Sequence, residues 1–270
     1  MVLTFKMKIF ISIFILTISL ITNASDTNLN ARDSSTENRK DLISDILDKM
    51  EIAVDPNQRA EEVKTLRTVM DITIPSENIL LKVTVFDKFP DKTKLIQELP
   101  NGMRTVKVLN GESAWERVEP AGKTRIITGK ELDFMKFELF MKTPGVKLKQ
   151  IFKTVEIESK NEIVGEHECY KLKCIPSGDL ELPPITLFVD KSDFLTRRMD
   201  LLLPMPQGAI IIKNKILKYE VINGRNVPSN IEIIQGNATI LKKLISVDEN
   251  IEIPDTEFEN SKESDKTDTK

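Results

Sequence analysis

The side chains best suited to catalysis or metal binding are adjacent in the sequence. The chain has a single histidine, His167, which lies beside Glu168 and Cys169. A Ser–His or Cys–His nucleophile pair would have to use it, and a zinc ion would need about four ligands, which adjacent positions of one strand cannot supply. Residues 111–122 lack the spacing of a glycine-rich phosphate loop. We therefore predict that the protein is not an enzyme and has no catalytic residues, no metal site and no cofactor.

The two cysteines, Cys169 and Cys174, are five residues apart in a segment that has the pattern of a strand. In a regular strand their Cα atoms would be roughly 16 Å apart, whereas a disulfide requires less than about 7 Å. An odd spacing also directs the two side chains to opposite faces. We predict two free thiols, and the alternative is a turn or bulge that brings the cysteines together.

Export is indicated by the first 24 residues. Lys6 and Lys8 precede an apolar run over residues 9–21, and small residues lead to Ala24. This order is typical of a secretory signal peptide cleaved after Ala24. The alternative, a transmembrane anchor, is disfavoured because the run is shorter than the roughly 20 residues that span a bilayer. We predict a periplasmic protein.

Charge argues against nucleic acid as a partner. The chain has 39 basic and 42 acidic residues, with a formal net charge of -3. Its basic residues form no block, and nucleic-acid binding requires a clustered basic face.

Polar segments flank a single predicted domain in the sequence. Residues 25–38 predict a disordered lead and residues 259–270 a disordered tail, because both are polar and poor in apolar residues. Residues 39–258 between them show no fixed repeat. This domain begins with a helix over residues 41–52, where apolar residues recur at helical spacing.

Alternating apolar and polar residues predict many strands after this helix. They cover residues 63–74, 81–85, 94–99, 105–109, a short stretch around Trp115, and residues 152–158, 168–175, 185–189, 195–203, 209–219, 230–235 and 239–247. Short Gly-containing turns separate them, such as Asn101-Gly102 and Asn223-Gly224. The period changes once, over residues 129–142, which predict a second helix. Consecutive strands joined by short turns indicate antiparallel pairing.

About a dozen strands are too many for a flat open sheet, which curls as it widens. We predict a mainly β (α+β) fold, a strongly curved antiparallel sheet that forms an unclosed half-barrel with helices covering its concave face. The second helix is rich in Phe and Met, and Met adapts to varied apolar partners. An ordinary core helix is the equally weighted alternative. Two prolines exclude residues 201–206 from a central strand. The candidate cavity and lid residues are Leu132, Phe134, Met135, Phe137, Leu139, Phe140, Met141, Leu203 and Met205.

Five motifs in order resemble those of periplasmic carriers that sort outer-membrane lipoproteins, the LolA-like family. They are the Asn-Gly and Trp of residues 110–115, the helix start at 129–132, the Val-Gly and Cys-Tyr of 164–172, the hairpin of 188–198 and the Tyr to Val-Pro segment of 219–228. The resemblance implies an unclosed barrel with a helical lid over an apolar cavity for acyl chains.

The predicted function is that of a periplasmic carrier or binder of lipid or of lipoprotein acyl chains. Its partners would be a lipid or a lipidated protein, with inner- or outer-membrane envelope proteins as further candidates, and a monomer is expected. The alternative is an envelope sensor or protein-interaction module whose concave face contacts another protein instead of a lipid.

Overall fold

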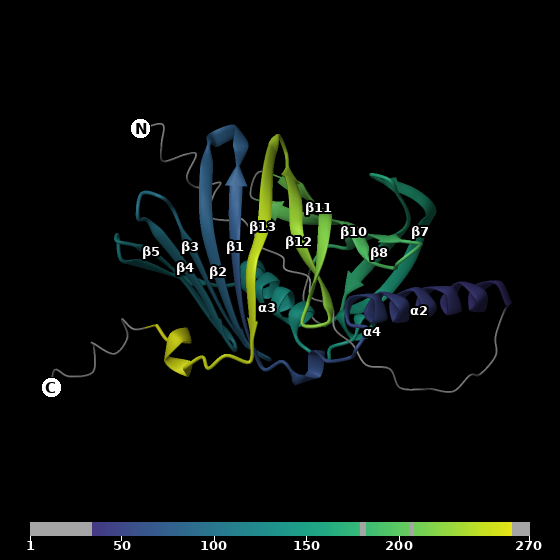
Figure 1. The fold of residues 1–270 in the computed structure, drawn as a ribbon, viewed down its shortest axis with the longest axis horizontal. Coiled ribbons are helices and arrows are strands. Elements are labelled where there is room, and N and C mark those ends of the chain that lie inside the picture. The colour runs from purple at the N-terminus through teal and green to yellow at the C-terminus, as the bar shows by residue number, and fades with distance from the viewer. Residues whose placement is uncertain (1–33, 179–181, 206–207, 261–270) are drawn as a thin grey trace.

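The computed structural model describes residues 34–178, 182–205 and 208–260, with the side chains of 34–38, 203–205 and 208 left undescribed. Thirteen strands form one antiparallel sheet in the order β6-β5-β4-β3-β2-β1-β13-β12-β11-β10-β9-β8-β7. Figure 1 shows this sheet curving around helix α3. Strands β6 and β7 are its two edges, so the sheet remains open. The predicted curved, unclosed antiparallel sheet is confirmed.

The order of the strands reflects two meanders joined by the first and last strands. The first comprises β1 (Thr65–Ile74), β2 (Ile79–Lys88), β3 (Lys92–Glu98), β4 (Arg104–Asn110), β5 (Ser113–Glu119) and β6 (Lys123–Ile127). The second comprises β7 (Phe152–Val164), β8 (His167–Pro176), β9 (Ile185–Asp190), β10 (Thr196–Met205), β11 (Gly208–Ile222), β12 (Arg225–Gln235) and β13 (Ala238–Glu249). Pairing of β1 with β13 unites them.

Several of the tight turns between strands contain residues with positive φ. Gly224 follows Asn223 between β11 and β12, with φ values of 79° and 50°. A Cβ atom on Gly224 would lie 2.7 Å from the Asn57 amide nitrogen, so glycine is needed there for space as well as for conformation.

Three α-helices lie among the described residues. They are α2 (Ser34–Val54), α3 (Lys130–Lys142) and α4 (Leu148–Ile151), and the short 3₁₀ helices are η1 (Ala60–Glu62), η2 (Pro75–Glu77) and η3 (Asp255–Phe258). Helix α2 begins at Ser34, within the segment expected to be a disordered lead. The signal peptide and most of the lead and tail lie outside the described residues.

Prolines were predicted to exclude residues 201–206 from central-strand pairing, and within the described part of that segment Pro204 pairs on one side only. Strand β10 continues to Met205, with Pro204 opposite Ala209 of β11. Pairing with β9 has already ended at Leu201 and Ile185. Pro204 therefore has one strand neighbour only, and a residue without an N–H is tolerated at such an edge position.

The main apolar core fills the concave side of the sheet. It joins α2 residues such as Ile46 and Met50, α3 residues such as Phe137, and inward residues of the central strands such as Ile72 and Ile233. Helix α2 supplies the amphipathic stripe expected from its sequence, with Ile46, Leu47, Met50 and Val54 all buried.

Candidate functional site

Helix α3 divides its apolar side chains between two clusters. Phe134, Phe137 and Met141 pack in the main core. Met135 and Leu139 join Leu109, Ala114 and Ile127 of β4 to β6, with Leu132 partly buried against them. Phe140 is 37% exposed. The helix is thus apolar on more than one side, as its sequence indicates. The side chains of the other two candidates, Leu203 and Met205, lie outside the described part of the chain.

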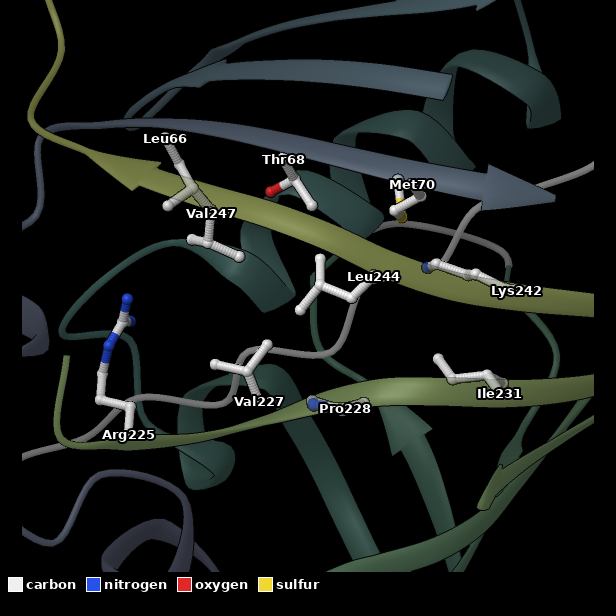
Figure 2. A pocket seen from close by; sticks show the side chains of 10 residues that line it. All are labelled: Leu66, Thr68, Met70, Arg225, Val227, Pro228, Ile231, Lys242, Leu244 and Val247. Atoms are coloured by element: carbon white, nitrogen blue, oxygen red, sulfur yellow. The ribbon is translucent and has the colours of Figure 1, made fainter. Parts of the chain in front are cut away.

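A narrow opening separates β12 from β13 on the concave side. These strands pair from Asn230 with Lys243 to Gln235 with Ala238, whereas β13 stays paired with β1 as far as Glu249. Over residues 225–229 and 244–249 the two strands share no ladder. We call this opening the β12–β13 slot. Its lining, shown in Figure 2, is Leu66, Thr68, Met70, Arg225, Val227, Pro228, Ile231, Lys242, Leu244 and Val247.

The β12–β13 slot is narrow as it stands. The space between its side chains, open solvent included, is about 430 Å³, of which about 20 Å³ admits the centre of a water molecule. An acyl chain would therefore require the slot to widen. No backbone ladder between β12 and β13 would have to break for that, because none joins them there.

An ion pair closes the outer end of the slot. The Arg225 guanidinium of β12 pairs with the Glu249 carboxylate of β13. The end of α2 packs behind this point, where the Asn226 amide donates to the Ala53 carbonyl at 2.7 Å. Burial lowers the pKa of Arg225 from its usual value.

Charged side chains line the concave face beside the inner end of the slot. The Lys142 ammonium of α3 donates to both oxygens of Asp87 on β2, at 3.1 and 3.2 Å, and both residues are buried. Glu138 lies one turn before Lys142. Lys242 of β13 is only 5% exposed, and its Nζ atom has no hydrogen-bond partner among the described residues.

Burial changes the protonation of two of these groups. It raises the pKa of Glu138 to about 7, against the opposing effect of Lys142. It lowers the pKa of Lys242 to about 7, with Glu138 opposing the shift and Lys142 adding to it. For Lys142, burial alone would lower the pKa, but Asp87 and Glu138 outweigh it and raise the value. Near neutral pH, Glu138 and Lys242 can each hold or release a proton.

Lys242 was missed by sequence reasoning. Its strand has Ile240 and Leu244 on the same face as Lys242, but also Leu241 and Ile245 on the opposite face. The two faces are equally apolar, so the sequence alone gives no way to tell which lysine points inward. The pairing of β13 with β1 and β12 shows that Lys242 points inward, because it lies opposite the buried residues Ile72 and Ile231.

The histidine and cysteines lie away from the slot. His167 Nδ1 is 2.6 Å from the buried Asp190 carboxylate. Although burial alone would raise the pKa of Asp190, hydrogen bonds from Ser192 and Arg197 outweigh it and lower the value to about 2. Cys169 and Cys174 are free and lie in different apolar clusters.

A second, wider groove lies between α2 and β7. Its lining includes Arg39, Lys40, Glu156, Glu158 and Lys171. Because most of its side chains are charged, it lacks the apolar lining that an acyl chain requires.

No helix in the described part of the chain has the length and apolar character needed to cross a bilayer. No set of three or more His, Cys, Asp or Glu side chains in those same residues is arranged to hold a metal ion.

Comparison with solved structures shows a LolA-like fold. A DUF1329 family protein from Desulfovibrio piger aligns with a TM-score of 0.55 and 14% identity, covering 82% of this chain and 98% of that one. A LolA superfamily protein from Nitrosomonas europaea gives 0.54 and 12%, covering 81% and 98%. A domain described as an outer membrane lipoprotein-sorting protein from Vibrio parahaemolyticus gives 0.51 and 10%, covering 82% and 96%. No family model and no curated protein sequence matches the chain.

Proposed function

We propose that the protein is a non-enzymatic periplasmic carrier or binder of acyl chains, from lipids or lipoproteins, that acts in outer-membrane lipoprotein sorting. The observation that carries the proposal is the apolar β12–β13 slot, which opens the concave face of the sheet beside the Phe- and Met-rich helix α3. The LolA-like fold supports it. In this proposal the acyl chain lies along the widened β12–β13 slot, against side chains such as Leu66, Met70 and Leu244.

Burial of the acyl chain would supply the binding free energy. Each CH₂ group removed from water contributes about 0.8 kcal/mol. Ten such groups would contribute roughly 8 kcal/mol before the cost of widening the slot. No catalytic group is needed for such binding, and release would follow when the slot widens again.

A blocked slot tests this proposal. Leu244→Trp places a bulky ring in the slot, whereas Ile245→Trp places the same ring on the opposite face, where Ile245 is 52% exposed. We expect palmitate binding to weaken at least tenfold in the first variant and to stay unchanged in the second. Equal binding by both variants, or no binding by the wild-type protein, would contradict the proposal.

The native ligand can be sought directly. We expect mass spectrometry of protein purified gently from an envelope fraction to detect co-purified lipid above that carried by Leu244→Trp. The intact mass of the same sample tests export, because removal of residues 1–24 is expected. A full-length chain in the periplasmic fraction would contradict the proposed signal peptide.

A second candidate function, an envelope interaction module, is favoured by exposed apolar side chains. These lie on the convex face, whereas the concave face was expected from the sequence to make the contact. They are Leu80, Leu202, Ile211, Ile234 and Leu241, which are between 36% and 53% exposed. This candidate predicts that Ile234→Asp with Leu241→Asp abolishes a complex with an envelope protein and leaves palmitate binding unchanged. Loss of palmitate binding in that variant would contradict it.

A further inference from the structure

Lys242 stands out because it is a buried cation without a hydrogen-bond partner among the described residues. The side chain is 5% exposed, and it lies among apolar slot residues such as Met70 and Ile231. An unpaired buried ammonium group is costly, and proteins normally pair such a group or neutralise it. A group of this kind that points into an apolar slot calls for an anionic partner.

The protein's own charges leave Lys242 unpaired. Asp87 of β2 already accepts two hydrogen bonds from Lys142 of α3. Glu138 of α3 acts on Lys242 electrostatically but makes no hydrogen bond with it, and Lys142 repels it. On the neighbouring strands Lys242 faces Ile72 and Ile231, which carry no charge.

Once widened, the slot would hold an acyl tail beside this cation. Lys242 lies at its inner end and Arg225 at the outer end (Figure 2). From Lys242 to Val247 the strand spans five residues, or roughly 17 Å. The slot-lining residues between these two ends are apolar apart from Thr68, and Arg225 is already paired with Glu249. Among the described residues, Lys242 is therefore the one cation lining the slot that has neither an ion-pair nor a hydrogen-bond partner.

We propose that the β12–β13 slot binds an amphiphile that has one acyl chain and an anionic head, a carboxylate or a phosphate, and that Lys242 binds the head. The tail lies along the slot towards the Arg225–Glu249 ion pair, which opens to admit it. This inference rests on the proposed function and adds the charge of the ligand. A charge-assisted hydrogen bond in a buried site corresponds to roughly a 10- to 100-fold gain in affinity.

Calorimetric titration with palmitate and with its uncharged methyl ester tests the assignment on the full mature chain. We expect the wild-type protein to bind palmitate at least tenfold more tightly than the ester. Lys242→Met should remove this preference and keep the affinity for the ester. Lys243→Met is the matched control, because Lys243 is the adjacent, exposed residue on the opposite face, and it should behave as wild type.

The outcomes separate the two proposals. If neither palmitate nor the ester binds, the proposed function fails. If both bind equally to the wild-type protein, or if Lys242→Met keeps the preference for palmitate, acyl binding stands and the role of Lys242 is refuted. Lys242→Arg should retain the preference, which excludes loss of folding as the cause. A parallel titration with lysophosphatidate distinguishes the head groups, since tighter binding than palmitate identifies a phosphate as the preferred anion.

Discussion

Replacement of Lys242 by methionine should stabilise the ligand-free protein at neutral pH. The two side chains have similar length, but methionine brings no charge into an apolar site. Burial lowers the pKa of Lys242 from 10.5 to about 7, so the folded protein holds this proton less readily than the unfolded chain. Between these two pH values the unfolded chain binds more protons, and the stability of the wild-type protein therefore rises with pH.

The magnitude follows from the same shift. Each pKa unit corresponds to about 1.4 kcal/mol. Between pH 7 and pH 9.5, with Lys242 half protonated at the lower limit, the wild-type protein should gain about 3 kcal/mol from this group. Lys242→Met lacks this titration. We expect the variant to be more stable than wild type at pH 7 and its advantage to shrink by about 3 kcal/mol at pH 9.5.

Urea denaturation of delipidated protein at the two pH values measures this difference. Trp115, the single tryptophan, is buried and supplies the fluorescence signal. Lys243→Met is the control, and it should differ from wild type by less than about 0.5 kcal/mol at either pH. A Lys242→Met variant that is less stable than wild type at pH 7, or whose advantage does not depend on pH, would refute the reasoning.

Three further predictions concern the interior. Lys142→Met should destabilise the protein by about 3–5 kcal/mol because it leaves Asp87 buried and unpaired, and adding Asp87→Asn should restore most of the loss in urea denaturation. Phe137→Ala should lower stability by about 3–5 kcal/mol through the cavity it creates, whereas Phe140→Ala, on the exposed side of the same helix, should lower it by less than about 1 kcal/mol; equal losses would contradict the packing of α3. Burial raises the pKa of both β8 thiols, so a disulfide-exchange reagent at pH 8 should detect no thiol in the native protein and two per chain in denaturant.

Much of the fold could be predicted from residue periodicity, because strands such as β2 bury every second residue. The elements that were missed lack that signal. Strand β6 (Lys123–Ile127) is a five-residue edge strand whose side chains are mostly exposed, so no alternation marks it. Helix α4 (Leu148–Ile151) has four residues, too few to show a helical period.

The site was less accessible to sequence reasoning than the fold. The composition of α3 correctly indicated a helix with apolar residues on more than one side, but the slot depends on which strands pair and where the pairing stops. The sequence prediction began this strand at Asn230, whereas β12 begins at Arg225 and pairs with β11 alone over its first residues. Register of this kind arises from the whole sheet and is not encoded in one segment.

One residue nevertheless helps to explain why the slot forms at this place. Pro228 lies in β12 where the ladder to β13 is absent, and proline has no N–H to donate to a neighbouring strand. On the other side of the slot, the register of β1 with β13 shifts between Val69 and Met70, so that Ile245 is left as an extra residue. A bulge of this kind bends its strand. The missing donor and the bend together hold β12 away from β13, and Lys242 lies just inside the point where they separate. A proline in a central strand and a buried lysine with no partner among the described residues both lower stability, and proteins keep such locally unfavourable features mainly at functional sites.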